Sequence, residues 1–255
     1  MSTVERINIL GAEQELENKV TFKDIVNTLR LYFKKVELQV KVEAIAFQIL
    51  SLEVKVRTGI IRELTFSSGN TKMGRILNVN FPVGITCRPD APCKKGCYAT
   101  NGNFKFINTV LAYWRNYYVW KYWPERAAEQ LSFALGGVRF FRCFASGDIP
   151  DYKFLDAVMK AAERNPKCDV WVPTKKYELV NAWMDRHNGN MPKNVHVMFS
   201  KWKDWEPENP YGFAVSEVDF CDGTEHSGFR CPGHCSECHH CFEMERGETI
   251  IYKKH

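Results

Sequence analysis

The spacing of apolar residues divides the chain into two parts. Residues 1–66 contain no cysteine, and the run from Thr21 to Lys35 repeats apolar side chains at helical spacing, with Thr21 at the N-cap position. Residues 36–57 have no single period, because VELQVKVE and LEVKVR alternate like strands while AIAFQIL does not. We interpret residues 1–66 as an N-terminal accessory segment that forms a packing or dimer surface, and we expect the chemistry elsewhere.

From residue 76 onward, predicted strands alternate with predicted helices. The strands are expected at residues 76–86, 138–145, 168–173, 194–200 and 213–220. The helices are expected at residues 106–135, with a break near Trp123, at 151–164 and at 175–188. This alternation is typical of a parallel sheet with right-handed crossovers. We therefore predict an α/β domain over residues 67–220 and a C-terminal cysteine-rich segment over residues 221–255.

Small polar residues follow the first four of these strands. They are Thr86–Cys87, Ser146–Asp148, Thr174–Lys175 and Ser200–Lys201. Ligands of parallel α/β folds bind beyond the carboxyl ends of the strands. We therefore expect these four groups to converge on one rim, beside the first cysteines.

Ten cysteines occur in the 255 residues, and seven of them lie in two short segments. The three-cysteine loop contains Cys87, Cys93 and Cys97, and the four-cysteine loop contains Cys231, Cys235, Cys238 and Cys241. The N-terminus mixes charges from the fifth residue and has no apolar signal core. We therefore expect a cytoplasmic protein, in which thiols stay reduced and serve as soft metal ligands.

The composition of the chain limits the classes of binding partner that we expect. Hydrophobic residues make up 45% and charged residues 25% of the chain, as in ordinary globular proteins. No stretch approaches the roughly 18–20 uncharged residues of a membrane span, so no membrane partner is expected. The net charge of +5 is dispersed along the chain, which permits nucleic acid as a partner without indicating it.

The three-cysteine loop is one ligand short of a complete site. A [4Fe–4S] cluster usually takes four cysteine thiolates, so three would leave one iron open for chemistry. The alternative is a structural zinc ion whose fourth ligand is Cys143, Cys168, Cys221 or a histidine.

A strand that leads into three cysteines, then Tyr98 and a helix, resembles the radical S-adenosylmethionine superfamily. FRCFASGDIP is similar to the Gly-Gly-Glu-Pro turn of that superfamily, with Ser146, Gly147, Asp148 and Pro150 in the matching places. Two departures stand out. The cysteine spacing is five then three intervening residues rather than three then two, and aspartate replaces glutamate.

The resemblance implies a partial (β/α) barrel of radical S-adenosylmethionine type. It implies a [4Fe–4S] cluster on the three-cysteine loop and S-adenosylmethionine on its open iron, with an electron donor as a further partner. The ammonium of S-adenosylmethionine would be held by Asp148 in the Ser146–Gly147 turn. Thr174 and Ser200 would contact its ribose or carboxylate, and Lys175 would pair with its carboxylate.

Residues 66–245 also resemble an uncharacterised family of tailed-phage proteins. The shared features are SGNxKxG (Ser68, Gly69, Asn70, Lys72 and Gly74), the CYA motif and the SGD turn. This resemblance implies a partial barrel and the host cytoplasm as the location, but no settled activity.

The four-cysteine loop supplies enough thiolates to close a site. It is expected to hold either a second [4Fe–4S] cluster, which would pair with the first as an electron relay, or a zinc ion. His234, His239 and His240 could replace one cysteine as a ligand.

Three functions follow from these features. The first is reductive cleavage of S-adenosylmethionine for radical chemistry on an unknown substrate. The second is a non-catalytic iron–sulfur or zinc-stapled phage protein that binds nucleic acid or a host protein. The third is a redox sensor.

The aromatic run at residues 113–123 either stacks on bases or packs on the sheet. The sequence specifies neither the substrate nor the oligomeric state.

Overall fold

The computed structural model describes residues 19–33, 39–69, 72–203 and 205–254. Residues 1–18 of the accessory segment and Asn70 of the phage-type motif therefore lie outside the described residues. Two helices come first in the described chain, α2 (Phe22–Tyr32) and α3 (Gln39–Arg57).

Helix α2 confirms the helix predicted from the apolar spacing. The Thr21 side chain accepts from the Asp24 N–H at 3.2 Å, and the Asp24 carboxylate accepts from the Thr21 N–H at 2.9 Å, which is a capping box. Helix α3 decides the ambiguous region in favour of a helix. Its buried residues recur at helical spacing beneath the strand-like alternation, at Val42, Ile45, Ala46, Ile49 and Val56.

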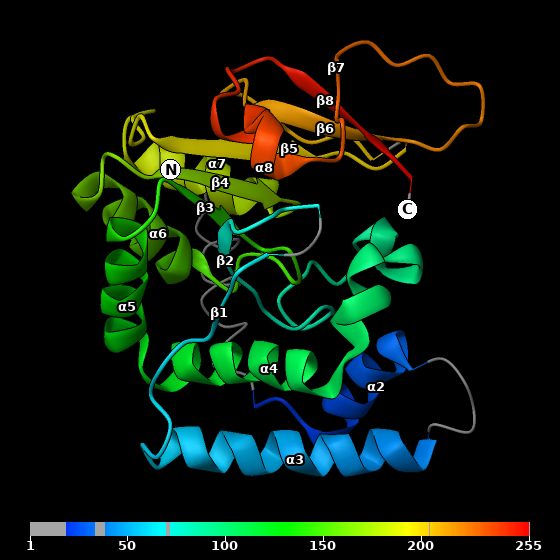
Figure 1. The fold of residues 1–255 in the computed structure, drawn as a ribbon, viewed down its shortest axis with the longest axis vertical. Coiled ribbons are helices and arrows are strands. Elements are labelled where there is room, and N and C mark those ends of the chain that lie inside the picture. The colour runs from blue at the N-terminus through cyan, green and yellow to red at the C-terminus, as the bar shows by residue number, and fades with distance from the viewer. Residues whose placement is uncertain (1–18, 34–38, 70–71, 204, 255) are drawn as a thin grey trace.

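One sheet organises the rest of the described chain (Figure 1). Its strands are β1 (Phe66–Ser67), β2 (Leu77–Val79), β3 (Phe140–Cys143), β4 (Asp169–Thr174), β5 (Val195–Ser200), β6 (Ala214–Asp219), β7 (Phe229–Arg230) and β8 (Thr249–Lys253). Their order is β1-β2-β3-β4-β5-β6-β8-β7, and every neighbouring pair except β1 and β2 is parallel. The predicted parallel α/β arrangement is confirmed.

The four main helices pack on one face of this sheet. They are α4 (Ile107–Tyr122), α5 (Pro124–Gly136), α6 (Tyr152–Arg164) and α7 (Tyr177–Arg186). Because β2 to β6 follow one another in order, same-handed crossovers carry the chain over the same face each time. This is the winding of a (β/α) barrel, but the sheet remains open and does not close.

The other face of the sheet is covered by the C-terminal segment. A separate apolar cluster lies there, and it includes Met73, Trp171, Met198, Phe242 and Ile250. The short helix α8 (Cys235–Cys238) crosses this face in front of the central strands (Figure 1). Strand β8 then joins the sheet between β6 and β7. The cysteine-rich segment is thus built into the same sheet as the α/β region.

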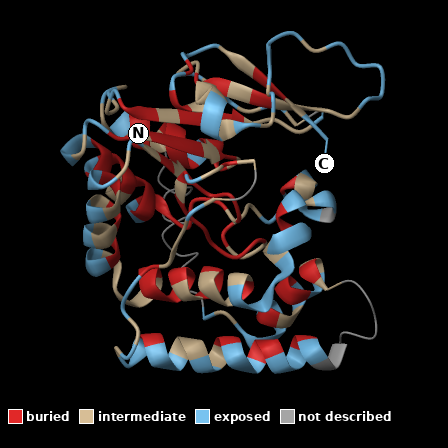
Figure 2. Ribbon diagram, in the orientation of Figure 1, coloured by how far each residue is buried: buried red, intermediate tan, exposed pale blue. Residues whose placement is uncertain are grey.

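The aromatic run at residues 113–123 serves packing. Helix α4 buries Tyr113, Trp114, Tyr117, Tyr118 and Trp120, each no more than 4% exposed, and Figure 2 shows its sheet-facing side in the buried colour. These rings have no free face on which a base could stack. No helix in the described ranges is long and apolar enough to cross a membrane.

A buried asparagine network ties the N-terminal part to the strand ends. The side chain of Asn116 accepts from the Thr65 N–H at 2.7 Å and donates to the carbonyls of Thr65 at 2.9 Å and Asn80 at 3.0 Å. The side chain of Asn80 accepts from the Ser146 N–H at 3.0 Å. Helix α4, β2 and the turn after β3 are therefore linked through two amides.

We predict that Asn116→Ala lowers the free energy of unfolding by about 2–4 kcal/mol, because it removes the hydrogen-bond partner of one buried and two part-buried backbone groups. Urea denaturation measures the change. The exposed Asn190 is the matched control, and Asn190→Ala should change stability by less than about 0.5 kcal/mol. Equal effects of the two substitutions would contradict the network.

Candidate metal centres

The three-cysteine loop lies on the side of the sheet toward which the parallel strands run (Figure 1). Cys93 is in a 3-10 helix, Pro92–Gly96, and Cys97 ends it. All three cysteines lie outside any disulfide and are half-buried. Burial raises the pKa of Cys87 to about 12, and the nearby Asp148 carboxylate and the thiols of Cys97 and Cys93 add to the rise. The three sulfur atoms and Asp148 therefore share one region.

Asp148 is the centre of the predicted rim. Its Oδ1 accepts from the Thr174 hydroxyl at 2.6 Å and from the Ile149 N–H at 2.8 Å, and its Oδ2 accepts from the Lys175 N–H at 2.9 Å. Its own N–H donates to the Thr86 hydroxyl at 3.1 Å. Burial raises the pKa of Asp148, although these hydrogen bonds oppose the rise. The ends of β2, β3 and β4 thus meet as predicted, beside Cys87.

Gly147 makes this turn possible. Its φ of +75° lies in the left-handed region, and a Cβ atom there would stand 2.7 Å from the Phe81 carbonyl oxygen and 2.7 Å from the Thr86 hydroxyl. The neighbouring Ser146 hydroxyl donates to the same Phe81 carbonyl at 3.0 Å. Ser146 and Gly147 therefore shape the turn.

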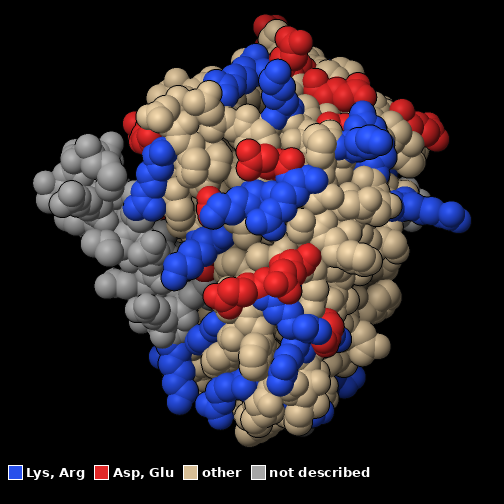
Figure 3. All heavy atoms as spheres, turned by 90° about the vertical axis from the view of Figure 1, so that its left-hand side faces the viewer, with Lys and Arg blue, Asp and Glu red and all other residues tan. Residues whose placement is uncertain are grey.

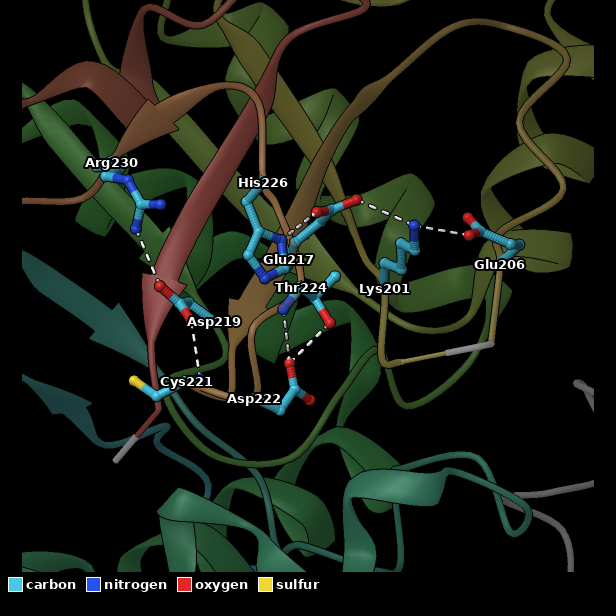
Figure 4. A network of polar contacts seen from close by, with 9 residues as sticks. All are labelled: Lys201, Glu206, Glu217, Asp219, Cys221, Asp222, Thr224, His226 and Arg230. Carbon is cyan, nitrogen blue, oxygen red and sulfur yellow. Dashed lines mark hydrogen bonds and ion pairs between the residues drawn. The ribbon is translucent and has the colours of Figure 1, made fainter.

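Of the fourth predicted group, Ser200–Lys201, only Ser200 is connected to the rim. The Ser200 carbonyl accepts from the hydroxyl of Tyr177, the first residue of α7, so Ser200 is joined to the rim through α7. Lys201 points elsewhere, because its ammonium forms ion pairs with Glu206 at 2.6 Å and Glu217 at 3.0 Å (Figure 4). Lys175 reaches Asp148 through its backbone N–H.

The accessory segment reaches this region, which the sequence did not indicate. Tyr32, in the last turn of α2, is buried. Burial raises the pKa of Tyr32, the nearby Ser146 side chain and Val83 backbone oppose the rise, and Tyr113 and Cys97 add to it. The only sequence signal is that Tyr32 continues the apolar face of a capped helix.

The four-cysteine loop lies on the face of the sheet opposite the helices. The Cys235 N–H donates to the Lys72 carbonyl at 2.8 Å, and the Cys231 N–H donates to the Ile251 carbonyl at 2.9 Å. The Cys241 sulfur is 3.4 Å from the Tyr252 hydroxyl. Burial raises the pKa of Cys241 to about 11, and its neighbours include Cys231 and Cys235. At least three of the four thiols therefore lie near one another.

Arg142 on β3 connects the two cysteine loops. It donates from Nη2 to the hydroxyl of Tyr98, the residue after Cys97, at 3.3 Å. It also stacks at 4.4 Å from the Trp171 ring centroid, in the apolar cluster against which Cys231, Cys235 and Cys241 pack. Neither Arg142 nor Trp171 was among the residues predicted from the sequence. The alternation of Arg142 with Phe141 and Cys143 could have marked it as facing the other side of the strand.

The donor chemistry at both loops fits a metal–thiolate centre. Within the ranges that the structure describes, no three Cys, His, Asp or Glu side chains form a group that could hold a metal ion. Thiols outside any disulfide gather at each loop, and two buried N–H donors without an acceptor among the described residues, Nε of Arg142 and Nε1 of Trp171, lie near the four-cysteine loop.

An α/β protein with two cysteine loops on an open parallel sheet is the class that fold and site define. Within this class, the family described as gene product 88 matches residues 61–218, which is more than half of the chain. The chain therefore belongs to the gene product 88 family, in agreement with the resemblance to phage proteins. The matched region contains the three-cysteine loop and the Asp148 turn and ends before the four-cysteine loop. No curated protein and no solved structure matches the chain.

We predict that Gly147→Ala destabilises the protein by about 1–3 kcal/mol more than Gly212→Ala, because only the first methyl group meets crowded atoms. Gly212 is a matched control, since its φ is +65° and a Cβ atom added there would have no other atom within 4 Å. Urea denaturation of both variants measures the difference. Equal losses of stability in the two variants would show that position 147 does not require glycine because of close packing.

Proposed function

We propose that this protein is an iron–sulfur protein whose three-cysteine loop forms a radical S-adenosylmethionine-type site. One observation carries the proposal: Thr86, next to Cys87, is hydrogen-bonded to the Asp148 backbone at 3.1 Å, at the carboxyl ends of parallel strands. Three thiols and an acidic turn thus occupy the place where such a site binds its cofactor. When bound, a cluster with an open iron supplies the electron that cleaves S-adenosylmethionine and starts radical chemistry on a substrate.

The chain's own residues supply binding and orientation. A carboxylate has about four acceptor positions, and Asp148 uses three of them within the protein. The remaining position on Oδ2 is available to the ammonium of S-adenosylmethionine. Thr174 and Ser146 would act chiefly by fixing Asp148 and its turn, since their hydroxyls already donate to protein acceptors.

A non-catalytic metal-stapled phage protein is the second candidate. It is favoured because the C-terminal segment with the four-cysteine loop packs over the sheet face opposite the helices, which in a closed barrel would line the interior. A nucleic-acid partner receives little support from the face of the molecule that Figure 3 draws. On the face drawn in Figure 3, Lys and Arg side chains lie among Asp and Glu side chains rather than in one basic patch.

We predict that S-adenosylmethionine changes the electron paramagnetic resonance spectrum of the reduced, anaerobic protein, and that reduction then yields cleaved S-adenosylmethionine. Cys93→Ala should abolish both effects. Replacing Cys93 tests the site more specifically than replacing Asp148 would, because loss of Asp148 would also remove the hydrogen bonds between the strand ends.

Cys221→Ala is the control, since Cys221 is exposed and belongs to neither loop; it should behave as the parent does. A cluster spectrum that does not change when S-adenosylmethionine is added would instead support the non-catalytic candidate.

A further inference from the structure

Two buried N–H donors near the four-cysteine loop have no acceptor. They are Nε of Arg142 and Nε1 of Trp171, and neither has a hydrogen-bond partner among the described residues. Leaving a buried donor unpaired typically costs about 1–3 kcal/mol, so two adjacent examples call for an explanation. The two side chains are stacked, with the guanidinium carbon 4.4 Å from the ring centroid.

Arg142 also lacks a carboxylate partner in the described part of the chain. Its other contacts are with uncharged atoms, the Met73 sulfur at 3.1 Å and the Tyr98 hydroxyl at 3.3 Å. A partly buried cation with no counter-ion is unfavourable. Its neighbourhood nevertheless contains a set of potential anions, because Cys231, Cys235 and Cys241 pack against the apolar cluster that holds Met73 and Trp171.

A metal centre on four thiolates would supply both the missing hydrogen-bond acceptors and the missing counter-ion. Four thiolates around Zn²⁺ or a [4Fe–4S]²⁺ core leave a net charge of about −2, and sulfur atoms of such centres accept N–H hydrogen bonds. Residues outside the ligand set commonly supply such bonds and charges.

We propose that Arg142 and Trp171 form the outer shell of a metal–thiolate centre on Cys231, Cys235, Cys238 and Cys241. Both N–H groups donate to its sulfur atoms, and the guanidinium balances part of its charge. This inference rests on the expectation from the sequence that the four-cysteine loop holds a metal. It is independent of S-adenosylmethionine chemistry. Because Arg142 also binds Tyr98, the same side chain couples this centre to the three-cysteine loop.

The test uses the full chain with Cys87, Cys93 and Cys97 replaced by alanine, so that bound metal belongs to the four-cysteine loop. Zn²⁺ is added to the reduced apoprotein, and its affinity is measured by competition with a chelator. Arg142→Met should weaken binding by about 10–100-fold. Arg142→Lys keeps the charge but not the Nε–H donor, so it should weaken binding less than Arg142→Met does. Trp171→Phe should also weaken binding by a smaller factor.

Two controls match these substitutions. Arg139→Met removes an arginine just before β3 that pairs with Asp169, and Trp114→Phe removes another buried indole N–H without an acceptor, on the helical face. Both should bind Zn²⁺ as the parent does. If Arg142→Met does not fold, the comparison of Trp171→Phe with Trp114→Phe decides.

Parent-like affinity in folded Arg142→Met and Trp171→Phe would overturn the inference while leaving the metal centre in place. A parent chain that binds neither Zn²⁺ nor iron on this loop would remove the centre and the inference with it. Neither result bears on S-adenosylmethionine cleavage at the three-cysteine loop, which is measured separately.

Discussion

The buried carboxylate of Asp148 holds together the strand ends on which the candidate site depends. It joins the end of β3 to the end of β4 through Thr174 and Lys175, while its backbone joins the segment after β2 through Thr86. Removing a carboxylate from water is costly unless several donors compensate for it, and here three donors do so. The three-cysteine loop begins one residue after Thr86, so its place follows from the same hydrogen bonds.

A second constraint is the one-sided winding of the sheet. Sequential parallel strands place all four main helices on one face and leave the other face apolar and open. In a closed barrel that face would line the interior. Here the C-terminal segment covers it and brings the four-cysteine loop against Trp171 and Met198. Arg142, which projects from β3 toward this face, then contacts Tyr98 beside the other loop.

Local periodicity and capping predicted α2, the four main helices and the central strands, and the rule that ligands bind at the carboxyl ends of parallel strands predicted the convergence of strand ends. The helix α3 was not predicted, because its segment also alternates like a strand. The pairing of β8 with β6 depends on contacts between residues far apart in sequence, and no local pattern encodes it. For the same reason, the sequence identified the cysteines and the Asp148 turn but not Tyr32, Arg142 or Trp171. Their importance comes from which face of an element they occupy and what lies opposite.

The most direct test of the central claim is the iron and sulfide content of the anaerobically purified chain in which the four-cysteine loop carries alanines. The account predicts about four irons and about four sulfides per chain, held by Cys87, Cys93 and Cys97. Additional replacement of Cys93 should abolish them. A folded chain that contains zinc alone, or no metal, would contradict an iron–sulfur centre on the three-cysteine loop.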